Sequence, residues 1–250
     1  MKKHIPNIIT LLNLVCGSCA VILSLWELYF PAFWFIIGAA MFDFMDGFFA
    51  RLLKAYSDIG KELDSLSDLI SFGLAPSLMF FTWYYKSGHE YSLLSFIPLI
   101  IVAFSALRLA KFNTDTRQSV NFIGLPTPAD AMIIASVAAY GHVCRLCGTD
   151  SIVLQLLDSG WFIPVCSIIL SLLLVSEIPM FSLKKKKLSF RTNPTICLFL
   201  SVSVLLVVTG EILYPHKSIA LGNIPLWIAL VFAFYLILNL IIAPFGKKES

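Results

Sequence analysis

Long apolar stretches recur along the chain, and short polar segments separate them. Eight stretches run approximately over residues 7–29, 31–53, 63–84, 91–112, 125–145, 160–180, 194–212 and 220–245. Each is close to the ~20 residues that a helix needs to cross a bilayer, whereas a membrane β-strand needs only about 10. The pattern therefore predicts an all-α fold, a polytopic membrane bundle of about eight transmembrane helices.

The composition agrees with a membrane location. Of 250 residues, 58% are apolar and 13% are charged, against about 25% charged residues in an average soluble domain. A soluble fold of this size cannot hide so much apolar surface, because it still needs a polar exterior. This excludes a soluble enzyme, a disordered chain and a nucleic-acid-binding protein.

Basic residues indicate the orientation. If the N-terminus is cytosolic, fifteen of the 18 Lys and Arg residues fall on the cytosolic side, and only Lys86, Arg145 and Lys217 fall outside. This bias follows the positive-inside rule, so we expect both termini in the cytosol. The tract Lys184–Lys187 then serves as a topology anchor in an inner loop. A chain this short favours a prokaryotic plasma membrane.

Four carboxylates interrupt the second and third apolar stretches. Asp43 and Asp46 are three residues apart, and Asp64 and Asp68 are four apart, so each pair shares a helix face. An ionisable residue inside a span costs about 2.5–3.5 kcal/mol on insertion scales and indicates function. At 1.5 Å per residue, Asp43 lies about 18 Å along its span from the outer end. All four acids are therefore expected at a similar depth near the cytosolic face.

Four such carboxylates would repel one another, and two divalent cations would cancel their charge. Because all the ligands are oxygens, the ions would be Mg²⁺ or Mn²⁺. Two alternatives remain at this point. The acids could form a proton or ion pathway in a transporter, or they could pair with Arg51 and Lys54.

The acids stand in the pattern D-x2-D-G-x2-A-R-x8-G-x3-D-x3-D, which covers residues 43–68. At every fixed position this resembles the signature of the CDP-alcohol phosphatidyltransferase family. The resemblance implies an enzyme, active as a homodimer, in which an alcohol displaces CMP from a CDP-linked lipid. It implies that two divalent cations are held by Asp43, Asp46, Asp64 and Asp68, and that Asp68 is also the catalytic base.

The same resemblance assigns six residues to the CDP moiety and its phosphates: Asn7, Thr10, Gly47, Ala50, Arg51 and Gly60. Gly47 and Ala50 lack bulk, so a nucleotide can lie against the helix. Arg51 lies one turn from Gly47 and can contact phosphate. The first two residues belong to I-P-N-I-I-T-L-L-N-L-x2-G, residues 5–17, which is similar to the family's N-terminal pattern; helix capping is the alternative.

Two further segments concern the acceptor alcohol. S-A-L-R-L-A-K-F-N at 105–113 and N-F-I-G-L-P-T-P-A-D at 121–130 resemble the phosphatidylserine synthases of the integral-membrane type. This resemblance implies that L-serine attacks CDP-diacylglycerol and gives phosphatidylserine and CMP. The residues assigned to serine or to lipid phosphate are Arg108, Lys111, Asn113 and Asn121. Interfacial snorkelling of the two cations and a different acceptor, glycerol 3-phosphate or inositol phosphate, are the alternatives.

The resemblance covers most of residues 5–135, and the family core has six spans. We therefore expect one membrane domain, residues 1–250, with a catalytic six-helix core in 1–180 and two additional helices in 194–245. Asp130 is expected to be a structural carboxylate at a helix N-terminus. The cysteine pairs Cys16/Cys19 and Cys144/Cys147 lie on different spans, so no shared zinc site is expected.

Overall fold

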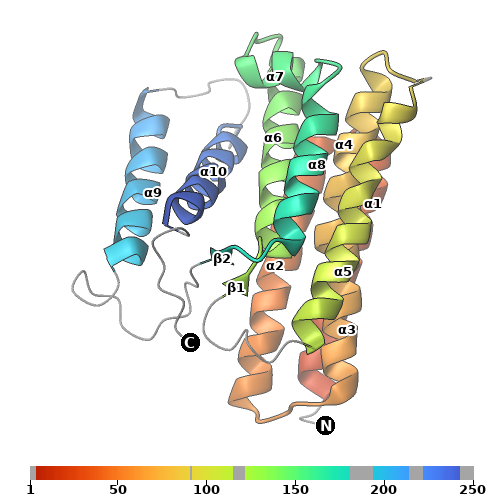
Figure 1. The fold of residues 1–250 in the computed structure, drawn as a ribbon, viewed down its shortest axis with the longest axis vertical. Coiled ribbons are helices and arrows are strands. Elements are labelled where there is room, and N and C mark those ends of the chain that lie inside the picture. The colour runs from red at the N-terminus through yellow and green to blue at the C-terminus, as the bar shows by residue number, and fades with distance from the viewer. Residues whose placement is uncertain (1–3, 91, 115–121, 181–193, 214–221, 243–250) are drawn as a thin grey trace.

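The computed structural model describes residues 4–90, 92–114, 122–180, 194–213 and 222–242, and almost all of them are helical (Figure 1). A π-helical segment, Leu69–Leu74, joins α3 to α4, and a 3₁₀ segment, Leu93–Leu99, leads into α5. The α-helices are α1 His4–Leu25, α2 Tyr29–Leu52, α3 Asp58–Asp68, α4 Ala75–Lys86, α5 Ile100–Thr114, α6 Thr127–Cys147, α7 Ile152–Leu157, α8 Phe162–Val175, α9 Pro194–Leu213 and α10 Ile224–Ile242.

The protein is an integral membrane protein with several transmembrane helices. Among the described residues, six helical segments are long and apolar enough to cross a membrane: 4–25, 29–52, 58–86, 93–114, 127–147 and 224–242. These fall in the first five predicted stretches and in the last. The all-α prediction is confirmed, apart from one short pair of strands.

The count of eight spans is not confirmed. The sixth predicted stretch contains a shorter apolar helix, α8, and in the seventh stretch the side chains are described for only part of α9. Helix α8 has 14 residues, which is about 21 Å and less than the ~30 Å of a bilayer core. It ends where Ser176 adopts an extended conformation. Within the described part of α9, the apolar segment is Leu198–Gly210.

Two short paired strands connect the segment before α6 to the segment after α8. Strand β1, Phe122–Ile123, pairs antiparallel with β2, Pro179–Met180. Gly124 follows β1 with φ +75°, and its N–H donates to the carbonyl of Ile178 at 2.9 Å. A Cβ atom there would lie 2.6 Å from the carbonyl oxygen of Leu174. The left-handed backbone and this close approach both require glycine.

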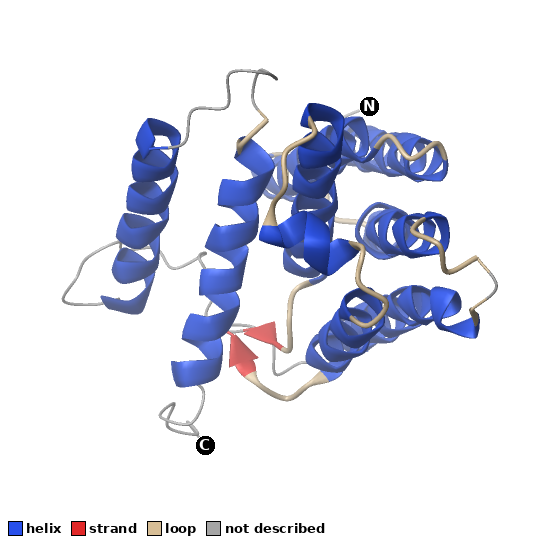
Figure 2. Ribbon diagram, turned by 90° about the horizontal axis from the view of Figure 1, so that it is seen from above, coloured by secondary structure: helices blue, strands red, loops and turns tan. Residues whose placement is uncertain are grey.

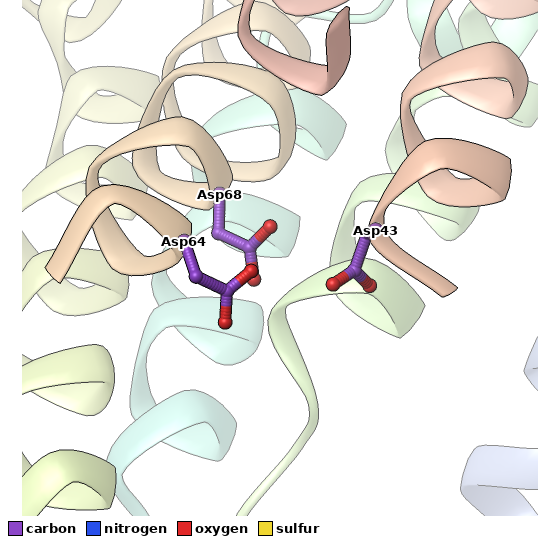
Figure 3. A group of neighbouring side chains, drawn as sticks. All are labelled: Asp43, Asp64 and Asp68. Carbon is purple, nitrogen blue, oxygen red and sulfur yellow. The ribbon is translucent and has the colours of Figure 1, made fainter. Parts of the chain in front are cut away.

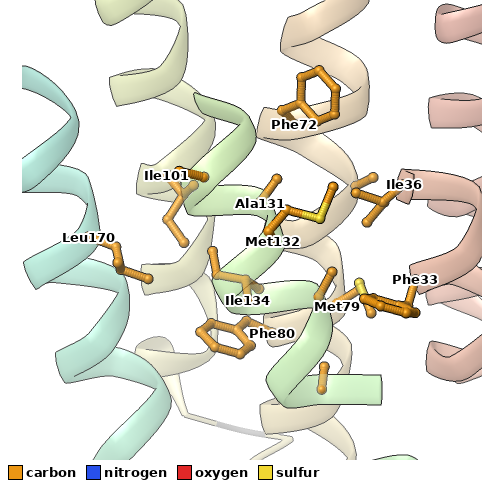
Figure 4. Close-up of a cluster of buried hydrophobic side chains, with 14 of the residues drawn as sticks. Phe33, Ile36, Phe72, Met79, Phe80, Ile101, Ala131, Met132, Ile134 and Leu170 are labelled. Carbon is orange, nitrogen blue, oxygen red and sulfur yellow. The ribbon is translucent and has the colours of Figure 1, made fainter. Parts of the chain in front are cut away.

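Helix α6 is the central element of the bundle and packs against α2, α4 and α10. Its fully buried alanines, including Ala131, Ala135 and Ala138, allow the close approach typical of membrane helices. Larger side chains of the neighbouring helices, such as Phe33 of α2 and Phe80 of α4, fill the space around it (Figure 4). Seen from above, α9 and α10 lie along one side of the bundle (Figure 2).

The π-helical segment changes the register of the third span directly after Asp68. Pro76 follows it and cannot donate a backbone hydrogen bond to the preceding turn, so the regular α-helical ladder cannot run through this region. Short π-helical turns are frequent at functional sites. Here the segment places Ser71 against α1, as described below.

At the opposite end of the bundle, one carboxylate joins three helical elements. Asp158, after α7, accepts hydrogen bonds from Trp83 Nε1 at 3.0 Å, from Ser87 Oγ at 3.1 Å and from the guanidinium of Arg145. That guanidinium also lies 4.3 Å from the centre of the Trp83 ring. Asp158 therefore ties α4 and α6 to the chain that leads into α8.

Replacing Asp158 with alanine is expected to lower the free energy of unfolding by about 1–3 kcal/mol, because the indole N–H of fully buried Trp83 loses its acceptor. Thermal unfolding of the purified protein in detergent measures the change. Asp150→Ala, at an exposed loop position, is the matched control and is expected to shift stability by less than about 0.5 kcal/mol. Equal melting temperatures for both variants would contradict this role.

Candidate active site

Three carboxylates from two spans converge at the end of the bundle where α1 begins. Asp43 comes from α2, and Asp64 and Asp68 come from α3 (Figure 3). One oxygen of each lies within 4.8 Å of the others. Asp68 is buried, and the other two are half-buried. The convergence expected from the helical spacing is thus present for three of the four acids.

The fourth acid, Asp46, lies outside this group of three. Its carboxylate accepts a hydrogen bond from the Thr10 hydroxyl at 2.6 Å, and the residue is 5% exposed. Asp46 also lines a cavity, together with Asp64. The structure therefore connects Asp46 to α1 and to the cavity wall, and its role as a metal ligand stays a prediction.

Asn13 of α1 holds Asp68 in place, and Ser71 of the π-helical segment holds Asn13; neither residue was predicted to belong to the site. Asn13 Nδ2 donates to Asp68 Oδ1 at 3.1 Å, and Ser71 Oγ donates to Asn13 Oδ1 at 2.7 Å. Gly17 allows the approach, because a Cβ there would lie 2.7 Å from Ser71 Cα. Thr10, Asn13 and Gly17 recur at helical spacing in an otherwise apolar span, and this spacing is the signal that could have identified Asn13.

A cavity of about 210 Å³ opens beside the carboxylates, between α1, the end of α2 and the beginning of α3. Tyr56 and Lys61, which occupy unspecified positions of the motif, also line it. Among its lining residues are five of the six assigned to the CDP moiety: Asn7, Thr10, Gly47, Ala50 and Gly60. The sixth, Arg51, is exposed, and its Nη1 lies 3.6 Å from the position of a Cβ on Gly47. Arg51 can therefore reach a phosphate beside the cavity.

The four residues assigned to the acceptor lie in different surroundings. Arg108 is 7% exposed and donates from Nη1 to Thr127 Oγ1 at 3.1 Å. Lys111 is exposed on α5 and is not part of that buried region. Asn113 donates to Ser65 Oγ at 2.7 Å. Asn121 lies outside the described residues. Among the three that the structure describes, only Arg108 is a buried charge, and it interacts electrostatically with Asp68.

The sequence model of the CDP-alcohol phosphatidyltransferases matches residues 3–172. The chain belongs to this family. The protein is therefore an enzyme, a transferase of phospholipid biosynthesis with CDP-alcohol phosphatidyltransferase activity, and the family implies CDP-diacylglycerol as a substrate.

Curated relatives give a narrower comparison. The chain is similar to the CDP-diacylglycerol–serine O-phosphatidyltransferase of Helicobacter pylori, with 30% identity over 200 residues, 79% of this chain and 80% of the relative. It is 36% identical to the Bacillus subtilis protein of that name over 151 residues, 59% of this chain and 82% of the relative. It is 28% identical to the Methanocaldococcus jannaschii protein of that name over 237 residues, 95% of this chain and 94% of the relative.

Members of this family typically use divalent metals, and the aspartate cluster fits such ions. All three clustered side chains are carboxylates, and two of them lie on one face of α3. Oxygen-only ligation selects hard cations such as Mg²⁺ and Mn²⁺. Asp43, Asp64 and Asp68 are therefore the residues that would hold a cation here.

Replacing Asn13 with alanine is expected to lower the rate of CMP release about 10-fold or more. A hydrogen bond to a charged group contributes about 1.5–3 kcal/mol, and a tenfold change in rate corresponds to about 1.4 kcal/mol. CMP release measured at saturating CDP-diacylglycerol tests this. Ser18→Ala, at an exposed site on the same helix, is the control. A rate for Asn13→Ala equal to that of the control would show that Asp68 is positioned without α1.

Proposed function

We propose that the chain transfers the phosphatidyl group from CDP-diacylglycerol to L-serine and yields phosphatidylserine and CMP. The observation that carries the proposal is the cluster of Asp43, Asp64 and Asp68 beside a cavity lined by the residues assigned to CDP. Serine as the acceptor is supported by the three relatives described above, all of which bear the name CDP-diacylglycerol–serine O-phosphatidyltransferase.

In this proposal the CDP moiety lies in the cavity, with Asn7 and Thr10 on one side and the small residues Gly47 and Ala50 on the other. Arg51 contacts the diphosphate. Divalent cations, when bound, neutralise the diphosphate and polarise the phosphorus. Two ions are proposed, with Asp46 as an additional ligand.

Asp68 acts as the general base for the incoming alcohol. The serine oxygen forms a bond to the phosphorus that carries diacylglycerol, and the bond from that phosphorus to the bridging oxygen breaks. CMP leaves with the bridging oxygen, and the hydroxyl proton passes to Asp68. Asn13 holds the Asp68 carboxylate in position through the 3.1 Å hydrogen bond.

The remaining parts of the proposal concern the setting of the enzyme. The chain crosses a prokaryotic plasma membrane with eight helices, including α8 and α9, and functions as a homodimer. Both termini and the active site face the cytosol, which the distribution of Lys and Arg supports. Helix α10 runs toward the end of the bundle at which α1 begins (Figure 1). Residues 1–180 form the catalytic core, and 194–245 add two helices.

The experiment that tests the function offers several acceptors to the purified protein. CMP release is measured with CDP-diacylglycerol, Mg²⁺ or Mn²⁺, and L-serine, glycerol 3-phosphate, inositol phosphate or no alcohol. Release with serine alone, with phosphatidylserine as the lipid product, is expected. If only glycerol 3-phosphate or inositol phosphate supports CMP release, the enzyme is still a CDP-alcohol phosphatidyltransferase, but serine is not its acceptor. No release from folded protein, together with cation flux in liposomes, would favour transport instead.

A further inference from the structure

Two ionisable side chains are buried near the catalytic carboxylates but are not part of their cluster. Arg108 of α5 is 7% exposed, and Asp130 of α6 is fully buried. A charge inside a protein is costly unless it is paired and hydrogen-bonded. This arrangement therefore requires a partner for each of the two charges.

One hydrogen bond connects the helices that carry these side chains. Arg108 Nη1 of α5 donates to Thr127 Oγ1 in the first turn of α6 at 3.1 Å. Asp130 is three residues after Thr127 and therefore lies on the same face of α6. Ser105, which is fully buried, lies three residues before Arg108 on α5. The four residues form one buried polar region.

The polar atoms of this region are not satisfied by one another. In the described part of the chain, Arg108 Nε, Ser105 Oγ and both carboxylate oxygens of Asp130 have no hydrogen-bond partner. Arg108 and Asp130 interact electrostatically. Among the ion pairs of the described residues, however, none joins a guanidinium nitrogen of Arg108 to a carboxylate oxygen of Asp130 within 4.0 Å. Buried polar groups are normally hydrogen-bonded, so these atoms indicate a missing ligand.

The catalytic base is the third group near Arg108. Asp68 also lies within electrostatic range of the guanidinium. Serine carries its carboxylate, ammonium and hydroxyl groups on neighbouring carbon atoms. A serine molecule bound between these groups would present its carboxylate to Arg108 and its hydroxyl to Asp68, and its ammonium group would need an anionic partner.

We propose that Arg108 and Asp130 form the acceptor site for a zwitterionic amino acid alcohol: Arg108 binds the carboxylate, and Asp130 binds the ammonium group. The inference rests on the proposed serine-dependent function and names the specificity residues for it. One buried cation and one buried anion match a ligand with one charge of each sign. Asp130 would repel the phosphate of glycerol 3-phosphate, and Arg108 would repel a purely cationic alcohol such as ethanolamine.

In this proposal a carboxylate of α6, Asp130, binds the ammonium group. From the sequence, Asn113 and Asn121 were expected among the residues for serine or lipid phosphate, and Asp130 was expected to be a structural carboxylate. Asn113 instead joins α5 to α3: its side chain donates to Ser65, and its carbonyl accepts from Lys61 Nζ at 2.8 Å. Helix α10 also contributes, because Tyr235 lies within electrostatic range of Arg108 and is 6% exposed. The region thus extends beyond the residues matched by the family.

The test measures CMP release by the full chain with CDP-diacylglycerol, Mn²⁺ and one of three acceptors. L-serine has both charges, glycerate lacks the ammonium group, and ethanolamine lacks the carboxylate. The wild-type protein is expected to use serine. Asp130→Asn is expected to raise the KM for serine about 10- to 100-fold, with a smaller change in kcat, and to reduce the preference for serine over glycerate. Asp150→Asn, in an exposed loop, is the matched control.

The possible outcomes distinguish a failure of the proposed acceptor site from a failure of the proposed serine-dependent function. Wild-type protein that releases no CMP with serine would overturn both. Wild-type activity with serine, combined with an unchanged KM and unchanged acceptor preference in Asp130→Asn, would overturn the inference alone. A lower kcat with an unchanged KM would assign Asp130 a structural role and also overturn it. If Asp130→Asn does not fold, Asp130→Glu keeps the charge but moves the carboxylate by one methylene group. A changed KM for serine would then support the site, and a KM equal to that of the wild type would overturn it.

Discussion

Asp68→Asn is expected to lower CMP release about 10²- to 10⁴-fold, the usual contribution of a general base. Asparagine has nearly the same shape and can still accept the hydrogen bond from Asn13, so the packing of α1 on α3 should persist. The amide cannot accept the proton of the incoming alcohol. Initial rates at saturating CDP-diacylglycerol and serine measure the effect, and thermal unfolding confirms that the variant is folded.

The matched control is Asp58→Asn, at an exposed position in the first turn of the same helix. It is expected to retain the wild-type rate. Titration with Mn²⁺ separates the two roles given to Asp68. If it is only a metal ligand, a higher Mn²⁺ concentration restores the rate of Asp68→Asn; if it is the base, the rate stays low at every concentration. A wild-type rate for Asp68→Asn would place the base elsewhere.

The convergence of the acids was predictable from the sequence because it depends on local spacing. Residues three or four apart share a helix face, and the hydropathy boundaries set their depth in the bilayer. Asp43, Asp64 and Asp68 meet for these reasons. The apolar pattern predicted about eight spans, and in the described part of the chain six of the predicted stretches contain helices long and apolar enough to cross the membrane.

The contacts that support the site depend instead on how distant helices pack. Asn13 and Asp68 are 55 residues apart, and their hydrogen bond requires both the approach at Gly17 and the π-helical turn after Asp68. Neither the register between two helices nor a π-helical turn follows from hydrophobic periodicity. The burial of Asp130 was missed for the same reason, because an acid in the first turn of a helix is ordinary until distant parts of the chain pack around it.

The end of α8 could not be predicted from hydropathy. Hydropathy continues through residues 160–180, but the helix ends at Val175 because the chain turns to pair β2 with β1. Backbone hydrogen bonds such as Leu125 N to Leu173 O, at 2.9 Å, depend on a partner segment about 50 residues away in the sequence. Apolar composition alone does not show where such a tertiary contact ends a helix.

Removal of divalent cations is expected to abolish CMP release. Without a cation, the carboxylates of Asp43, Asp64 and Asp68 lie within 4.8 Å of one another and repel. A chelator should therefore stop the reaction and also lower the melting temperature, because an ion that binds only the folded state stabilises it. Mg²⁺ or Mn²⁺ should restore both properties. CMP release and thermal unfolding, each measured against metal concentration, give two independent readouts.

Asp43→Asn tests whether the stabilising cation binds at the cluster of Asp43, Asp64 and Asp68. Asp43→Asn removes one charge and one ligand, so the Mn²⁺ concentration for half-maximal stabilisation should rise about 10-fold or more, while Asp58→Asn should match the wild type. The stability readout does not require turnover, so it reports on the metal even if the acceptor is not serine. Equal metal dependence of the melting temperature in Asp43→Asn and in the wild type would place the ion outside the cluster, and Asp46 beside the CDP cavity would then be the next carboxylate to replace.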